Sequence, residues 1–262
     1  MIRRYLDNMN EEQLLKARLK DLAFKSYKQN IYTYSSFLTP AELMTLDSMR
    51  EELKYVDYET YGGAFLCERQ MVRFGSEASL GYAGEWPIRI VKVEPLIEKF
   101  SDELSHRDFL GALMNLGIER SVLGDIIVKD GKRAYVFCQD SISAFMIEHL
   151  TKIKHTNVRC SLVDKDTDMG DLTPNLVDIS CIVSAPRFDA VIAVLAKCSR
   201  SEAVRLFQNG KVTLNGRQCE RNSMQLTEGD IFSVRGYGKY QYCGSGAETR
   251  KGRIYIHLKQ YN

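Results

Sequence analysis

The chain lacks the cysteine and histidine spacing that holds metals or disulfide frameworks. Its seven cysteines are scattered along 262 residues without a Cys-x-x-Cys pair, and their odd number argues against a disulfide framework. Its four histidines, His106, His149, His155 and His257, show no metal-ligand spacing. We therefore expect reduced cysteines that fill hydrophobic cores, and we expect neither a metal nor a cofactor.

Long apolar runs are also missing. No stretch approaches the roughly 20 apolar residues that a membrane-spanning helix needs. The first 20 residues, MIRRYLDNMNEEQLLKARLK, are charged throughout and lack the apolar centre of a signal peptide. The sequence therefore predicts a cytoplasmic protein.

Signatures of nucleotide chemistry are absent as well. Neither a G-x-x-x-x-G-K-[ST] loop nor a G-x-G-x-x-G turn occurs. The acidic stretch Asp164–Asp171 resembles a calcium loop only superficially, because it has no glycine at its sixth position and no glutamate at its twelfth. No catalytic residue and no metal ligand is assigned.

Charge is present but unevenly distributed. The whole chain has a net charge of only +2. Residues 187–262 carry 13 Lys or Arg and 6 Asp or Glu, a net +7, whereas residues 1–186 carry 23 and 28, a net −5. Arginines, which match phosphate geometry well, outnumber lysines in the basic part. This asymmetry is typical of a nucleic-acid-binding end.

Residues 187–234 contain a dense series of folding signals. Ser199 and Glu202 form a capping-box pattern that opens a helix over about 200–209, which ends at Gly210. Asn215-Gly216 predicts a tight hairpin after a strand over 211–214. Phe188, Val191, Ile192 and Leu195 form the apolar stripe of an earlier helix, and Glu228-Gly229-Asp230 leads into a strand over 231–234.

These elements resemble the S-four RNA-binding domain, which is named for a small-subunit ribosomal protein. The matching residues are Arg187-Phe-Asp189, Ser199-Arg200, Ala203-Val-Arg205, Gly210-Lys-Val212, Val212-Thr-Leu-Asn-Gly216 and Gly229-Asp230. The resemblance implies that two helices and the following loop grip structured RNA. It suggests these RNA-facing candidates: Arg187, Lys197, Ser199, Arg200, Arg205, Lys211, Asn215 and Arg217.

Some of these candidates have a structural explanation as well. Capping alone accounts for Ser199, and the positive φ of a tight turn accounts for Asn215. Asp189 is expected to cap or pair locally. Arg200, Arg205 and Lys211 have no structural reason beyond solubility, so RNA contact is favoured for them, chiefly at phosphates.

A β-hairpin extension follows this segment. We expect strands over Tyr240–Tyr242 and Ile254–Leu258, joined by a flexible Cys243–Ala247 stretch. Interleaved tyrosines and basic residues suit backbone tracking and base stacking, which makes Lys239, Arg250, Lys251 and Arg253 secondary RNA-binding candidates. An ordinary amphipathic hairpin with alternate tyrosines buried is an equal alternative.

The middle of the chain has the order strand, helix, two strands, helix, strand. This βαββαβ order predicts a ferredoxin-like, RNA-recognition-like domain over residues 88–165. Its third strand, Gly131–Cys138, places Ala134, Val136 and Cys138 on one face and Arg133, Tyr135 and Phe137 on the other. RNA-recognition domains carry stacking aromatics on this strand, so Arg133 and Tyr135 are further secondary candidates. Packing of this face against a neighbouring domain is an equal alternative, which is favoured for Phe137 and left open for Tyr135.

Residues 1–75 are predicted to form an α+β domain. Glu11–Lys28 is expected to be helical, and Thr39-Pro-Ala-Glu42 predicts a capped helix to about Leu53. A hairpin is expected to run from Tyr55–Tyr61 through Gly62-Gly63 to Phe65–Phe74. The predicted fold class is therefore α+β in three domains, over residues 1–75, 88–165 and 184–262.

This three-part order resembles the YlmH family, through Tyr61-Gly-Gly63, Glu68-Arg69, the middle domain and an S-four-type domain ending in Thr249-Arg-Lys-Gly-Arg253. The resemblance implies a bacterial, cytoplasmic, non-enzymatic RNA-binding protein. It further implies ribosomal RNA or tRNA as ligand, association with the large ribosomal subunit, and a role in translation quality control or rescue.

The alternative is an RNA-modifying enzyme, similar to a pseudouridine synthase, that uses the same domain as a tether. The Gly-Arg-Leu-Asp tetrapeptide of such enzymes is absent. Neither a membrane partner nor a small-molecule substrate is indicated.

Overall fold

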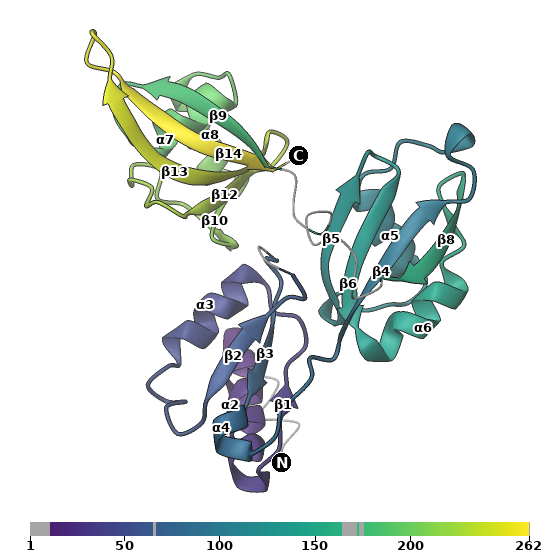
Figure 1. The fold of residues 1–262 in the computed structure, drawn as a ribbon. Coiled ribbons are helices and arrows are strands. Elements are labelled where there is room, and N and C mark those ends of the chain that lie inside the picture. Colours follow the sequence, from purple (N-terminus) through teal and green to yellow (C-terminus); the bar gives the residue numbers. More distant parts are fainter. Residues whose placement is uncertain (1–10, 65–66, 164–171, 173–175, 262) are drawn as a thin grey trace. The chain divides into compact units, whose positions relative to one another are not determined.

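The chain forms two compact units, Met1–Thr173 and Pro174–Asn262 (Figure 1). The structure is a computed structural model that describes residues 11–64, 67–163, 172 and 176–261. The calcium-like stretch Asp164–Asp171 and the charged first ten residues lie outside the described residues. In the part that is described, no helix has the length and apolar character needed to cross a membrane. The three domain boundaries expected from the sequence stay predictions.

The N-terminal part of the first unit packs helices on a small antiparallel sheet of order β1-β3-β2. Leu19, Ala23, Leu46 and Phe74 are among the residues of its core. Its elements are α2 (Glu11–Gln29), β1 (Thr33–Tyr34), α3 (Pro40–Ser48), β2 (Tyr58–Tyr61), β3 (Met71–Phe74) and α4 (Glu77–Leu80). The Thr39–Glu42 capping box is present as predicted.

Two predicted elements of this part have different bounds. Helix α3 ends at Ser48 instead of continuing to about Leu53, because the chain turns there and buries Met49 and Leu53 in the core. The β2–β3 hairpin exists, but Tyr61 pairs with Met71, so its loop is much longer than the Gly62-Gly63 turn. The backbone N–H groups of Glu68 and Arg69 in this loop bond to the Asp125 carboxylate instead of to a strand.

The middle part has the predicted βαββαβ order. Its antiparallel sheet has the order β5-β6-β4-β8-β7, and α5 and α6 pack on one face around a core that includes Val91, Phe109, Val136 and Met146. The Asp130-Gly131 turn has positive φ at both residues (55° and 61°), as the hairpin signal predicts. The elements are β4 (Ile88–Pro95), η1 (Glu98–Phe100), α5 (His106–Asn115), η2 (Arg120–Val122), β5 (Leu123–Lys129), β6 (Arg133–Gln139), α6 (Asp140–His149), β7 (Lys152–Ile153) and β8 (Thr156–Leu162).

The other face of this sheet is covered. Tyr135 and Phe137 on β6 pack with Ala64 and Cys67 of the β2–β3 loop and with Leu172. Tyr135 is 7% exposed and Phe137 is fully buried. The prediction that Phe137 packs is confirmed. For Tyr135 the structure favours packing over RNA stacking, because the residue is buried.

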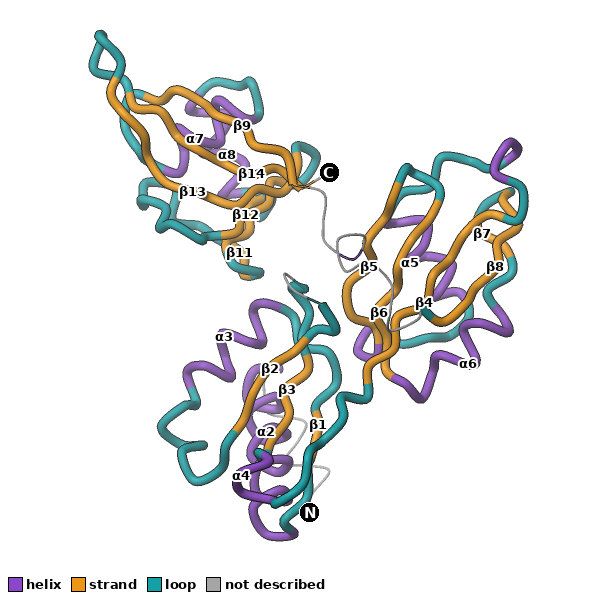
Figure 2. Tube along the Cα trace, viewed as in Figure 1, coloured by secondary structure: helices purple, strands orange, loops and turns teal. Residues whose placement is uncertain are grey.

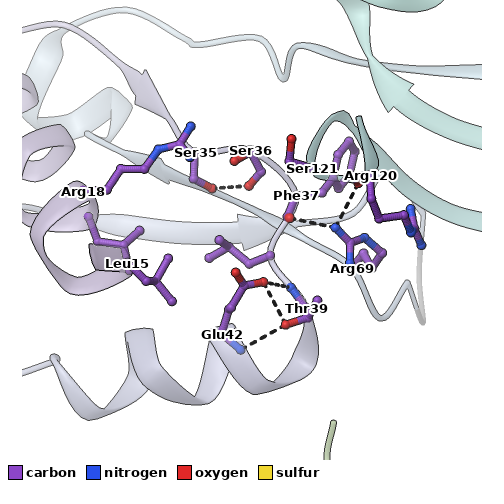
Figure 3. Close-up of a pocket in the computed structure, with 12 residues that line it drawn as sticks. Leu15, Arg18, Ser35, Ser36, Phe37, Thr39, Glu42, Arg69, Arg120 and Ser121 are labelled. Carbon is purple, nitrogen blue, oxygen red and sulfur yellow. Dashed lines mark hydrogen bonds between the residues drawn. The ribbon is translucent and has the colours of Figure 1, made fainter. Parts of the chain in front are cut away.

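Two half-buried arginines, Arg69 and Arg120, link the β2–β3 loop to the start of β5 (Figure 3). The Arg69 guanidinium donates to the carbonyl oxygens of Phe37, Arg120 and Leu123 at 2.9–3.2 Å. Arg120 donates to the carbonyl oxygens of Leu123 and Gly124. Burial, together with the nearby charge of Arg69, lowers the pKa of Arg120 to about 10. A cavity of about 280 Å³ lies beside this junction.

The C-terminal unit is an antiparallel sheet of order β11-β10-β12-β13-β14-β9 with two helices packed on one face (Figure 2). Phe188, Phe207, Phe232 and Tyr240 lie at the centre of its core. Its elements are β9 (Leu176–Val183), α7 (Phe188–Leu195), α8 (Arg200–Gln208), β10 (Val212–Leu214), β11 (Arg217–Gln218), β12 (Ile231–Val234), β13 (Gly238–Glu248) and β14 (Ile254–Tyr261).

Two features of this unit differ from expectation. Strand β9 was not predicted; it lies ahead of residue 184 and pairs along the whole of β14. Cys243–Ala247 is not a flexible connection but part of β13, with bulges beside Gly244 and Ser245 that accommodate the glycines. The turn between β13 and β14 lies at residues 249–252 instead, closed by Thr249 N–H to the Arg253 carbonyl oxygen.

Candidate nucleic-acid interface

Helix α7 begins at a position fixed by the loop that follows β11. The N–H groups of Phe188 and Asp189 donate to the carbonyl oxygens of Met224 and Asn222, both at 2.9 Å. These bonds satisfy donors that a helix start leaves without an intrahelical partner. Arg187 occupies the N-cap position, and its side chain makes no capping bond to the backbone. It is therefore available for another partner.

That partner is Asp189, which holds two arginines together. The Asp189 side chain is only 3% exposed and accepts from Arg187 Nε and Nη2 at 3.2 and 3.0 Å. It also accepts from Arg200 Nε and Nη2 at 3.1 and 3.2 Å. We call this group the arginine clamp: Arg187, Asp189 and Arg200. The expectation that Asp189 pairs locally is confirmed.

The clamp presents positive charge to solvent. The side chains of Arg187 and Arg200 are 41% and 48% exposed, so each guanidinium has one edge on the carboxylate and another toward water. Burial raises the pKa of Asp189, but the hydrogen bonds and charges of Arg200 and Arg187 outweigh burial and lower it overall. The carboxylate is thus ionised at neutral pH, and the three groups carry a net charge of +1.

Lys197 and Lys211 lie in the turns that end the two helices, one residue past the C-cap of α7 and two residues past the C-cap of α8. Lys197 donates its N–H to Val194 O, and Cys198 donates to Ala193 O, which together form a Schellman motif. Gly210 and Lys211 repeat the motif after α8, with bonds to Phe207 O and Leu206 O. Both lysine side chains are exposed near helix C-termini, where the helix dipole favours a cation.

The two Schellman motifs differ at the left-handed position. Gly210 has φ 63°, whereas Lys197 adopts φ 49° with a full side chain. A left-handed conformation costs a residue with a Cβ about 1–2 kcal/mol, so the sequence keeps a lysine where the backbone favours glycine.

The remaining α8 candidates have separate surroundings. Ser199 caps the helix, accepting from the Glu202 N–H while Glu202 reaches back to the Ser199 N–H at 2.8 Å, as the sequence predicts. Arg205 is exposed, and helical spacing places it away from the buried Ala203 and Phe207. The structure therefore brings Arg187 and Arg200 together, whereas Arg205 lies elsewhere on α8.

Asn215 is used by the fold. With φ 48° it forms the β10–β11 turn, and its amide donates to Asp230 Oδ1 at 2.8 Å and accepts from the Ile231 N–H at 2.9 Å. Because both polar ends of this amide are engaged in the unit, Asn215 is better explained as a turn residue than as an RNA contact. Arg217, the first residue of β11, is exposed.

The secondary candidates separate into three groups. Arg250, Lys251 and Arg253 are exposed at the β13–β14 turn. The Lys239 ammonium is half-buried and lies 4.9 Å from the centre of the Tyr261 ring. Arg133 belongs to the middle part, where it pairs with Asp130 at 2.5 Å.

The clamp is the feature that the sequence did not reveal. The spacing of Arg187 and Asp189 was visible, but the link from Asp189 to Arg200 depends on how α7 packs against α8. Among the described residues, no group of three or more His, Cys, Asp or Glu is placed to hold a metal ion.

Comparison with protein families matches two segments of the chain. Residues 83–167 match a family described as "Putative RNA-binding domain in YlmH", and residues 186–232 match the S4 domain. The first segment contains the ferredoxin-like sheet, and the second contains the clamp, both Schellman motifs and the Asn215 turn.

Two known proteins resemble the chain as a whole or in part. A Bacillus subtilis (strain 168) protein named "Ribosome-associated protein quality control protein P2" is 28% identical over 222 residues, covering 84% of this chain and 83% of that protein. The solved structure of "Cell division protein ylmH from Streptococcus pneumoniae" is 19% identical, with a TM-score of 0.48, covering 60% of this chain and 93% of that one.

The fold and its basic helix face define an RNA-binding protein of the S4 class. The two matched segments follow one another along the chain, and the similarity to the Bacillus subtilis protein extends over 84% of it. The chain carries an S4 domain at residues 186–232 and, over residues 83–167, a segment similar to the RNA-binding domain of YlmH.

Proposed function

We propose that the protein is a cytoplasmic, non-enzymatic factor that docks on structured ribosomal RNA or tRNA through its C-terminal unit. We further propose that it acts on the large ribosomal subunit in translation quality control. The observation that carries the proposal is the arginine clamp, two guanidiniums held on a buried carboxylate with their outer edges exposed. The name of the Bacillus subtilis relative supports the ribosomal setting.

The geometry suits phosphate recognition. A guanidinium offers donors in a fixed fork that matches phosphate oxygens, and contacts of this kind position a protein on RNA without reading its sequence. Lys197 and Lys211 add ammonium groups at two helix ends of the same unit. RNA binding by this set should weaken steeply as salt rises, because each neutralised phosphate releases counterions.

A double substitution tests the docking surface. Arg200→Ala with Arg205→Ala should reduce co-sedimentation with ribosomes, and the remaining binding should fall less steeply with salt than that of the original protein. Arg50→Ala with Lys54→Ala is the matched control, since it removes two exposed cations from the N-terminal part. Equal co-sedimentation of the Arg200/Arg205 variant and the control would exclude this surface.

A separate experiment addresses catalysis. The protein is incubated with bulk RNA, and the nucleosides are then analysed by mass spectrometry. We expect no new modified nucleoside. The appearance of one would replace the docking proposal with an RNA-modifying activity, for which the C-terminal unit would be the tether.

A further inference from the structure

The outward face of the C-terminal sheet carries a regular row of side chains on β14. The inward residues Ile256 and Leu258 are buried in the core beneath α7 and α8. Strand alternation therefore directs Tyr255, His257, Lys259 and Tyr261 to the opposite face. Tyr255 is 38% exposed and His257 is exposed. This row, called the β14 row below, is separate from the arginine clamp and does not depend on the docking proposed above.

The neighbouring strands leave the row open at His257, whereas Ile182 and Asp178 of β9 stand opposite Tyr255 and Lys259. On one side, Gly244 pairs with His257, and a Cβ on Gly246 would lie only 2.5 Å from His257 Nε2 and 3.3 Å from Tyr255 Cβ. On the other side, Ser180 of β9 pairs with His257. The His257 ring thus lies across a glycine of β13, and no bulky side chain stands directly opposite it on either strand. Its outer face is open to a flat ligand.

The spacing and charge of the row match unpaired RNA. Residues two apart on a strand are separated by about 7 Å, which is close to the distance between bases in an extended single strand. The β13–β14 hairpin carries Lys239, Arg250, Lys251, Arg253 and Lys259 against Glu248. Aromatic rings for bases alongside cations for the backbone are the combination used by proteins that bind single-stranded nucleic acid.

We infer that the β14 row is a second RNA-binding surface, which stacks the bases of a single-stranded segment on Tyr255 and His257. Lys259 and the basic β13–β14 turn contact the phosphates of that segment. Tyr240 and Tyr242, by contrast, point inward and are buried, so they serve the core. The hairpin therefore has two roles. Tyr240 and Tyr242 pack in the core, and the opposite face binds single-stranded RNA.

Fluorescence anisotropy with a labelled oligouridine of about ten nucleotides tests this surface on the full chain. Tyr255→Ala with His257→Ala should weaken oligouridine binding about tenfold or more, because two stacking platforms are lost. Tyr255→Phe should bind as the original protein does, since phenylalanine keeps the ring. Tyr237→Ala is the matched control, because Tyr237 is 44% exposed in the same unit and lies outside the row. Oligouridine binding that is unchanged in the Tyr255/His257 variant would overturn the inference.

Two further measurements separate this surface from the arginine clamp and from misfolding. The Tyr255/His257 variant should co-sediment with ribosomes more strongly than the Arg200/Arg205 variant. If only the Arg200/Arg205 variant lost oligouridine binding, the clamp and not the β14 row would be the single-strand site. In the unaltered protein, a 4-thiouridine oligonucleotide should crosslink to the peptide containing Tyr255–Tyr261. Crosslinks confined to α7 and α8 would refute the assignment without any variant.

Discussion

At the scale of single residues, Asp189 determines where two positive charges of the C-terminal unit lie, because it pairs with both Arg187 and Arg200. Its buried carboxylate holds the two arginines of the clamp, so in the proposed docking its contribution to RNA binding is indirect. Asp189 is thus a positioning residue. Its removal raises the net charge but releases both arginines, so it distinguishes the effect of net charge on RNA binding from the effect of arginine placement.

Asp189→Asn should weaken RNA binding although it makes the protein more positive. A neutral amide cannot hold two guanidiniums, so both side chains lose their fixed directions. Because the arginines are half exposed, we expect a loss of folding stability on the order of 2 kcal/mol. Binding to ribosomes and urea unfolding at pH 7 measure the two effects. An increase in RNA affinity would show that net charge alone matters.

The pKa of Asp189 adds a pH test. Because the arginines hold that pKa below its usual value, the clamp stabilises the fold above about pH 4 and loses this contribution as pH falls through the lowered pKa. The stability difference between the original protein and Asp189→Asn should therefore shrink in urea unfolding at pH 3 compared with pH 7. A difference that stays constant between the two pH values would contradict the ion pairing.

Lys197→Gly offers the opposite combination of effects. Glycine relieves the left-handed strain at φ 49°, so stability should stay equal or rise by up to about 1 kcal/mol. RNA binding should nevertheless fall, because an ammonium is removed. Thermal unfolding and ribosome co-sedimentation of the variant would show both changes. Lower stability would mean that the lysine side chain supports the fold.

At the scale of elements, local signals predicted most helices and turns. The capping boxes at Thr39 and Ser199, and the Asp130-Gly131 and Asn215-Gly216 turns, depend on neighbours in sequence, and all four are present. Strand β9 could not be predicted in the same way, because its place in the sheet comes from pairing with β14, which lies far along the chain. The clamp could not be predicted either, because the contact between Asp189 and Arg200 depends on how α7 packs against α8.

Glycines at the junction of the first unit test how tightly its elements pack. A Cβ on Gly124 would lie 2.8 Å from the Phe37 ring and 2.9 Å from Phe137, so Gly124→Ala should lower stability by about 1–3 kcal/mol. Gly111→Ala is the control, since a Cβ there meets nothing within 4 Å and alanine favours the α5 helix by about 1 kcal/mol. Urea unfolding should move in opposite directions for the two variants; equal shifts would contradict the tight junction.

At the scale of the whole molecule, the first unit hides the sheet face that an RNA-recognition fold offers to RNA. The sequence correctly assigned Tyr135 and Phe137 to the same face, yet it could not reveal that Ala64, Cys67 and Leu172 cover it. Strand alternation predicts which side chains share a face of the sheet. It does not predict what covers that face, because the covering residues come from distant parts of the sequence.

Cysteine labelling reports whether that face ever opens. Burial raises the pKa of both Cys67 and Cys138 to about 12, so neither thiol should react in the closed unit. If ribosome binding uncovers the sheet, iodoacetamide should label Cys67, which lies at the covered face, and spare Cys138, which lies in the core beneath α5 and α6. We expect both to stay unlabelled with and without ribosomes; selective labelling of Cys67 would show that the covering segment moves.

The arginine clamp has a consequence for the rate of association. Ordering a long side chain such as arginine costs up to about 2 kcal/mol in conformational entropy. In this protein Asp189 already orders Arg187 and Arg200 before any RNA arrives, so their ordering adds little to the barrier for binding. Encounter should then be governed mainly by long-range attraction between the basic unit and the RNA. Removing Asp189 should restore the cost of ordering the two arginines and slow association, although the protein becomes more positive.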